Sequence, residues 1–223
     1  MTEFFSFARL TLLSEFYLLI KMGVKERRER EKESLRQDIL DVAREMFATE
    51  GYESVSMRKI ADKIEYSPTT IYLYFKDKNE LLYQICEETF AQLGQNIREI
   101  SEPETDLLVR LQKGLRAYIE FGIAHPHHYQ VTFMSPMFSK PNDEYLYEGS
   151  MGQRTFDFLR SEITTCVEAG KLKNGNIDAI SQAFWAGIHG TTSLLIGHID
   201  FPFVEKSLLI DTVINSMIEG FKA

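Results

Sequence analysis

The sequence predicts an all-α protein, with an N-terminal three-helix unit of the helix-turn-helix type followed by a larger helical part. Apolar residues recur at i, i+3, i+4 and i+7, the spacing that gives a helix one buried face. Glycine, proline and capping residues bound these periodic segments. No segment of the 223 residues shows the convincing period-two alternation of a half-buried strand.

The first helix of the unit is expected to start near residue 34. Gly51 follows its last periodic residue and suits the C′ position, because glycine adopts left-handed backbone angles without strain. The apolar side chains on one face of this helix are Leu35, Ile39, Val42, Ala43, Met46 and Phe47.

Residues 56–78 then read as two short helices joined by a tight turn at Glu65 and Tyr66. Ser56 and Ser67 stand where N-caps belong, because a hydroxyl oxygen can accept a hydrogen bond from an otherwise unpaired backbone N–H. Pro68 falls at the first helical position, where a missing N–H costs nothing. The first of these helices buries Met57, Ile60, Ala61 and Ile64.

The second short helix has an unusual outer face. Ile71 and Phe75 point towards the first helix, and the opposite side carries Thr69, Thr70 and Leu73, with Tyr72 and Tyr74 on the flanks and Lys76 and Lys78 beyond. Hydroxyls can bond base edges or phosphates, apolar groups can meet thymine methyls, and lysines can meet phosphates. Spacing alone leaves two readings of equal weight, a major-groove reader and a generic helix pair with a solvated face.

The same stretch resembles the DNA-binding domain of TetR-family transcriptional regulators over residues 34–83. The resemblance rests on Ala43, Phe47, Gly51, Tyr52, Ser56, Arg58, Ile60, Ala61, the run from Ser67 to Lys78, and Leu81-Leu82. It implies a double-stranded DNA operator as partner. The residues expected to contact DNA are Ser56, Arg58, Ser67, Pro68, Thr69, Thr70, Tyr72, Leu73, Tyr74, Lys76 and Lys78. One departure is Glu65, which stands where the family usually has glycine, so a reshaped turn with an acidic group near DNA is expected.

The charge distribution is compatible with DNA binding at this end of the chain. The formal net charge is −8, which argues against a wholly basic nucleic-acid binder. Residues 22–80 carry 12 Lys+Arg against 13 Asp+Glu, whereas residues 81–223 carry 11 against 18. The anionic excess therefore lies in the second part and leaves the first nearly neutral.

A long helix is expected from Glu80 to about Ile100, with Pro103 marking its break. Further helical patterns cover residues 105–124, 127–134, 144–169, 177–197 and 203–222. The predicted organisation is an extension and charged arm (1–33), a DNA-binding domain (34–80) and a ligand-binding and dimerisation domain (81–223).

Aromatic and thioether side chains from several of these helices could line an apolar pocket, although for any single one of them a plain core position is the favoured reading. The residues predicted to bind a small-molecule effector are Tyr118, Phe121, Phe133, Met134, Met137, Phe156, Trp185 and His189. Residues 184–190 resemble the W-x-x-x-H-G signature of one TetR C-terminal domain type. His189 is either a polar contact in that pocket or a structural histidine bonded to a backbone carbonyl.

The last two predicted helices are the expected dimer interface. Small residues permit close helix approach, and the apolar stripe of the final helix is too wide for a lone terminal helix. The interface residues predicted here are Ala183, Gly187, Gly190, Leu209, Val213 and Met217. Two helices from each subunit would form a four-helix bundle, and its two-fold axis would present two recognition helices to a palindromic operator.

Two readings exist for the first twenty-two residues: a membrane-surface amphipathic helix, and an extension from an upstream start codon with Met22 as the working start. The second is favoured, and no membrane partner is expected. The charged run from Lys25 to Glu33 is either a basic arm for a DNA groove or a solvated helix with i, i+4 ion pairs.

The remaining signals exclude other classes. Cys86 and Cys166 read as reduced thiols in a cytoplasm rather than a redox pair. The H-P-H-H spacing of residues 125–128 matches no metal-ligand pattern, so neither a metal nor a cofactor is expected. No catalytic motif is present. The favoured function is a cytoplasmic, ligand-responsive repressor, ahead of an effector-independent regulator or activator, with an enzyme the least favoured.

Overall fold

A computed structural model describes residues 3–134 and 148–223, with side chains described from Gly23 onwards. The helices run in chain order as α1 (Glu3–Glu50), η1 (Tyr52–Ser54), α2 (Met57–Lys63), α3 (Pro68–Tyr72), α4 (Lys78–Ser101), α5 (Leu107–Ala124), α6 (Pro126–Tyr129), the π-helix η2 (Gln130–Met134), α7 (Met151–Glu168), α8 (Ile177–Gly197) and α9 (Lys206–Phe221). The described residues contain no strand, only one isolated bridge between Leu172 and Lys222. The all-α prediction is confirmed.

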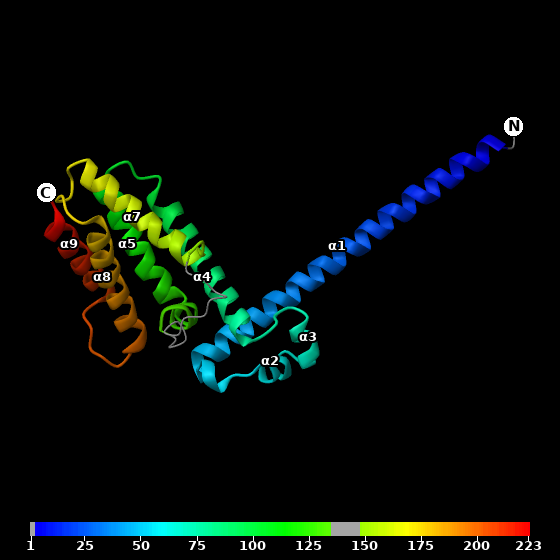
Figure 1. Ribbon diagram of the computed structural model, residues 1–223, viewed down its shortest axis with the longest axis horizontal. Coiled ribbons are helices and arrows are strands. Elements are labelled where there is room, and N and C mark those ends of the chain that lie inside the picture. Colours follow the sequence, from blue (N-terminus) through cyan, green and yellow to red (C-terminus); the bar gives the residue numbers. More distant parts are fainter. Residues whose placement is uncertain (1–2, 135–147) are drawn as a thin grey trace.

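Helix α1 is continuous and projects far from the rest of the molecule (Figure 1). The boundary predicted between residues 33 and 34 therefore falls inside one helix. The part from Gly23 to Ser34 is exposed, and Arg27 pairs with Glu31 at 3.3 Å in i, i+4 spacing. This geometry matches the solvated helical extension of the two readings for the charged run. None of the described helices has the combination of length and apolarity that crossing a bilayer requires.

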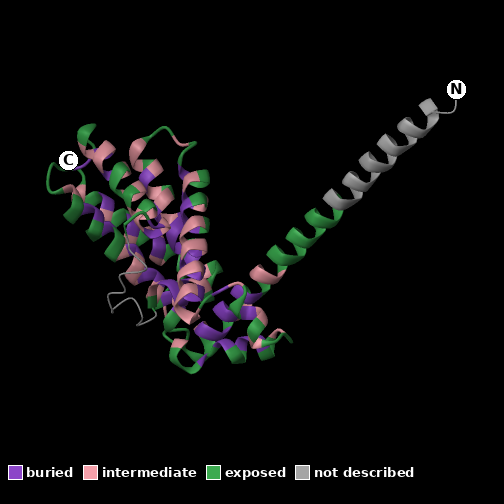
Figure 2. Ribbon diagram, turned by 45° about the vertical axis from the view of Figure 1, so that its right-hand side comes forward, coloured by how far each residue is buried: buried purple, intermediate pink, exposed green. Residues whose placement is uncertain are grey.

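The buried hydrophobic residues form two clusters. Figure 2 colours the buried stretches of the ribbon purple. One joins α1, α2 and α3 to the start of α4, where Leu81, Leu82, Ile85 and Cys86 are buried. The other joins the far end of α4 to α5, α7, α8 and α9. Because α4 contributes to both clusters, the boundary predicted between residues 80 and 81 also falls within a helix.

Local sequence explains where the short helices begin. Ser56 accepts a hydrogen bond from Lys59 N at 3.2 Å, and Ser67 accepts one from Thr70 N at 3.2 Å. Pro68 occupies the first turn of α3, as predicted. Helix α1 ends at Glu50, and Gly51 has a φ of 82°, which glycine adopts without strain.

Candidate functional site

The turn between α2 and α3 keeps left-handed geometry although glycine is absent. Glu65 has a φ of 61°, the one positive φ of a non-glycine residue among the described residues. Tyr66 N donates to Ala61 O at 3.0 Å and Glu65 N to Asp62 O at 3.3 Å, the two bonds of a Schellman motif. The expectation of a reshaped turn is not supported, because hydrogen bonding at the end of α2 holds Glu65 where glycine would normally sit.

Helix α3 presents the predicted outer face to solvent. Ile71 and Phe75 are buried against the neighbouring helices, whereas Thr69 is exposed. Tyr72 is 53% exposed and Leu73 is 77% exposed. Thr70, Tyr74 and Pro68 are half-buried, while Ser56, Arg58, Ser67 and Lys76 are exposed. All of these residues lie on or beside α2 and α3.

Lys78 differs from the phosphate contact that was predicted. Its Nζ donates to Tyr52 O at 2.8 Å and to Val55 O at 2.9 Å, and it lies 4.0 Å from the centre of the Tyr52 ring. Two of the three N–H bonds of the ammonium are therefore engaged within the protein. In this structure Lys78 ties the segment after α1 to the start of α4, and at most one donor is left for a phosphate.

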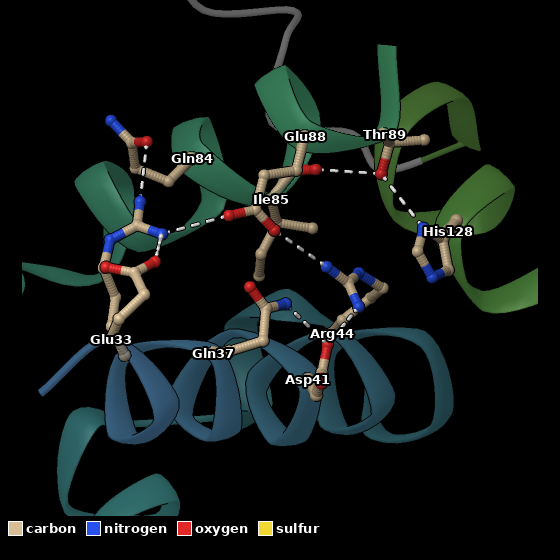
Figure 3. A network of polar contacts seen from close by, with 10 residues as sticks. Glu33, Gln37, Asp41, Arg44, Gln84, Ile85, Glu88, Thr89 and His128 are labelled. Carbon is tan, nitrogen blue, oxygen red and sulfur yellow. Dashed lines mark hydrogen bonds and ion pairs between the residues drawn. The ribbon is translucent and has the colours of Figure 1, made fainter. Parts of the chain in front are cut away.

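An ion-pair network that the sequence did not reveal seats α1 on α4. Glu88 accepts from Arg36 Nη1 at 3.1 Å through one carboxylate oxygen and from Arg44 Nη2 at 3.3 Å through the other. Arg44 also donates to Asp41 at 2.6 Å, and its side chain is only 7% exposed. Figure 3 shows Arg44 and Asp41 on α1 facing Glu88 on α4. Glu88 lies 44 or more positions from Arg36 and Arg44 in sequence, so no local sequence pattern predicts this contact.

Helix α6 reaches the same junction through His128, whose Nδ1 lies 3.4 Å from Thr89 Oγ1 (Figure 3). Thr89 already donates its hydroxyl hydrogen to Ile85 O at 2.8 Å, so His128 is the donor in this contact. Burial and, to a smaller extent, the nearby charge of Arg44 lower the pKa of His128 to about 4, so the imidazole is neutral near pH 7.

Aromatic side chains from α4 to α8 converge in the second cluster. The Phe133 ring lies 4.6 Å from that of Tyr129, 5.6 Å from that of His189 and 5.9 Å from that of Tyr118. Trp185 lies 5.7 Å from His189 and 6.0 Å from Phe156. Five predicted effector-binding residues, Tyr118, Phe133, Phe156, Trp185 and His189, are thus brought together. Tyr129 and Phe90 also belong to this group but were not in the predicted set.

A chain of hydrogen bonds runs through this aromatic group. The indole of Trp185 can only donate, and it lies 3.3 Å from Tyr118 Oη. Tyr118 Oη lies 3.2 Å from Tyr129 Oη, which is 2.5 Å from His189 Nδ1. Burial lowers the pKa of His189, which favours the neutral imidazole. When the Tyr129 hydroxyl donates to Nδ1, the remaining ring proton is on Nε2. That N–H faces Ser193 Oγ at 3.4 Å. His189 is therefore fixed by a tyrosine hydroxyl rather than by a backbone carbonyl.

Three predicted effector residues fall outside this group. Phe121 is buried and packs on His125, with 4.8 Å between the ring centres. Met134 is largely exposed at the end of η2, close to Gly197. Met137 lies outside the described residues. Among the described side chains of residues 23–134 and 148–223, no three from histidine, cysteine, aspartate or glutamate are placed to hold a metal ion.

Comparison with known proteins identifies both parts of the chain. The family model described as bacterial regulatory proteins of the tetR family matches residues 39–85. The model described as the tetracyclin repressor-like C-terminal domain matches residues 111–217. The chain belongs to the TetR family of transcriptional regulators.

Individual relatives agree with membership of the TetR family. An HTH-type transcriptional regulator of Staphylococcus aureus (strain USA300) is 27% identical over 156 residues, covering 64% of this chain and 84% of that protein. A solved TetR-family regulatory protein from Rhodococcus RHA1 has a TM-score of 0.71 at 19% identity, covering 84% of this chain and 97% of that one. FadR from Bacillus subtilis, solved in complex with stearoyl-CoA, has a TM-score of 0.71 at 20% identity, covering 83% and 98%. The TetR family consists of DNA-binding regulators, so the chain is a transcriptional regulator and not an enzyme.

The residues predicted for the dimer interface of this TetR-family chain do not all point outwards. A Cβ built on Gly187 would lie 2.2 Å from Met217 Sδ, so Gly187 lets α9 pack closely on α8 of the same chain. Gly187 and Met217 therefore contact each other within one chain, and their place in a dimer interface stays a prediction. Leu209 and Val213 are half-buried, and Leu209 packs on the core. Ala183 is exposed, and nothing lies within 4 Å of a Cβ built on Gly190.

Proposed function

We propose that this regulator is a repressor that dimerises on a palindromic operator and is released by a small, largely apolar effector. The single observation that carries the proposal is the position of residues 126–134, which belong to both clusters. Tyr129 and Phe133 lie in the aromatic group beside His189. Val131 of the same segment is buried in the N-terminal cluster with the start of α4.

This arrangement couples an effector site to the DNA-binding unit. A molecule that rearranges Tyr129 or Phe133 must also move Val131 and His128, because they lie on the same two helical turns. His128 and Val131 contact the region where α1 meets α4. An effector that favours one position of this segment would thereby favour one orientation of α3, and differential affinity for two states is what allosteric release requires.

The effector site we propose is the group formed by Tyr118, Phe133, Phe156, Trp185 and His189. Its side chains are aromatic, and His189 Nε2 and the Ser193 hydroxyl, 3.4 Å apart, offer hydrogen bonds to a carbonyl or carboxylate oxygen. The complex of the structurally similar FadR with stearoyl-CoA supports testing molecules with long apolar chains first.

For the dimer we propose the outward sides of α8 and α9. Leu194 and Leu208 are exposed there, together with Ala183, and Gly190 is half-buried beside them. The loop between the two helices adds three exposed apolar side chains, Ile199, Phe201 and Val204. Apolar side chains gathered on two adjacent helices suit an isologous interface. Because the proposed partner is DNA, we propose a cytoplasmic location for the protein. We also propose that the DNA-binding domain ends inside α4.

The test is selection of DNA fragments by the purified full chain from a random duplex library, followed by titration with candidate effectors. Trp185 is the only tryptophan, so its fluorescence reports on the proposed effector site directly. We expect a palindromic consensus, and release of DNA at the effector concentration that changes the fluorescence. Release by a molecule that leaves Trp185 unchanged would place the effector elsewhere, and selection of no DNA would refute the proposed function itself.

A further inference from the structure

The outward face of α3 lacks the side chains that read purines by paired hydrogen bonds. Residues 68–73 contain no arginine, lysine, asparagine or glutamine. Guanine is usually read by arginine or lysine at O6 and N7, and adenine by asparagine or glutamine at N6 and N7. A helix with this composition cannot discriminate bases in those ways, so its base recognition must use other chemistry.

Two of its hydroxyl groups are already engaged. Ser67 Oγ accepts from Thr70 N at 3.2 Å, and it lies 2.9 Å from Thr70 Oγ1. The capping contact that starts α3 therefore engages both groups, and one hydroxyl hydrogen of the pair stays available to donate. The Thr69 hydroxyl, the Tyr72 phenol and the apolar side chain of Leu73 take no part in this cap and lie on the outward face.

Leu73 is the most prominent of these groups. Its side chain is 77% exposed, whereas Ile71 and Phe75 on either side are buried almost completely. Leu73 has φ −74° and ψ −18°, so the helical geometry of α3 continues through it and directs the side chain away from the core. Tyr72 beside it is 53% exposed.

We propose that Leu73, flanked by Tyr72, reads the C5-methyl groups of thymines in each operator half-site. Among the groups on the major-groove edges of the four bases, the thymine methyl is the apolar one, and leucine is suited to cover it. This inference rests on the proposed function, because it requires α3 to lie in a major groove. It names the base that the recognition surface selects, which the family assignment does not.

The experiment removes the methyl groups and nothing else. Duplexes selected by the full chain from the random library are resynthesised with deoxyuridine replacing each thymidine in turn, and their Kd values are measured. Burial of one methyl group corresponds to about a fourfold change in Kd. A palindrome with one contacted thymine per half-site should therefore bind about fifteenfold more weakly when both are replaced.

Variants decide whether Leu73 is the reader. Leu73→Ala should bind the thymidine duplex more weakly and lose its sensitivity to deoxyuridine, while Leu73→Met, which stays apolar, should keep most of that sensitivity. Ile100→Ala, a change at an exposed apolar residue at the far end of α4, serves as the matched control and should behave like the natural chain.

Three results separate the possible failures. Equal Kd values of the natural chain for thymidine and deoxyuridine duplexes would overturn the inference, as would undiminished deoxyuridine sensitivity in Leu73→Ala. Both results would leave the proposed function standing, since DNA is still bound. If the library yields no bound duplex, the proposed function fails first and the inference falls with it.

Discussion

Replacing Glu88 with glutamine tests how the DNA-binding unit is seated on the rest of the molecule. The substitution keeps the shape of the side chain and removes the charge that Arg36 and Arg44 share. The half-exposed pair with Arg36 contributes at most about 0.5 kcal/mol. Arg44 is nearly buried and its Nε has no partner, so the loss of a charge-assisted bond there costs about 1.5 kcal/mol. We therefore expect Glu88→Gln to lower the free energy of unfolding by about 2 kcal/mol.

Urea unfolding of the full chain measures this effect, with circular dichroism following all helices and Trp185 fluorescence following the second cluster. Because the loss is local to the α1–α4 junction, helix content should begin to fall at lower urea while the fluorescence transition moves less. Glu33→Gln is the matched control: its carboxylate lies 3.7 Å from Arg36 Nη1 but is 71% exposed, so a change below about 0.3 kcal/mol is expected. Equal effects of the two substitutions would refute the reasoning.

Three further predictions concern single residues. Glu65→Gly should raise the free energy of unfolding by roughly 0.5–1 kcal/mol, because relief of the left-handed φ outweighs the greater flexibility of glycine in the unfolded chain. Urea midpoints measure this change, and a lower midpoint for the variant would contradict the prediction. His128 has its pKa lowered to about 4 from an ordinary value of 6.5, so the unfolded chain binds a proton first and stability is lost as pH falls from about 6.5 to 4. His128→Gln should remove part of that loss in urea titrations across this range, and an unchanged pH profile would count against it. Burial raises the pKa of the Cys86 thiol to about 12, so iodoacetamide at pH 8 should alkylate Cys86 only after the protein unfolds. Mass spectrometry measures the alkylation, and rapid alkylation of the native protein would disprove the prediction.

The short-range features of the DNA-binding unit were predictable because local chemistry determines them. The Ser56 and Ser67 caps, Pro68 at the start of α3 and the C-terminal Gly51 of α1 all follow from backbone groups within a few residues. The buried and exposed sides of α3 follow from helical periodicity alone.

The extents of the long helices were less predictable. Nothing in the sequence distinguishes a helix that starts near residue 34 from one that already runs through the charged segment, because charged residues with i, i+4 pairs are compatible with both. Helix α4 has one continuous apolar side that contributes to both clusters. The sequence pattern therefore gives no sign that the first two turns of α4 pack with the DNA-binding unit, and the domain boundary predicted from it lies at the start of the helix.

Contacts between distant segments account for the remaining differences. Lys78 was predicted to contact phosphate. Its actual acceptors, Tyr52 O and Val55 O, lie more than twenty residues away in sequence, so the sequence pattern could not reveal them. Gly187 and Met217 carry the composition of a helix–helix contact, but composition cannot say whether the second helix belongs to the same chain. Tyr129 belongs to the aromatic group because its hydroxyl oxygen contacts Nδ1 of His189, which lies sixty positions further along the chain.

The central claim, that a duplicated α3 reads a two-fold symmetric operator, is tested most directly by the stoichiometry and footprint of the selected complex. We predict two chains, or a multiple of two, on a palindrome whose half-sites are centred about one helical turn, roughly 34–36 Å, or a multiple of it apart. We further predict that Tyr72→Ala combined with Leu73→Ala abolishes the footprint without loss of helix content. One chain bound to an asymmetric sequence, or an intact footprint with the double variant, would contradict it.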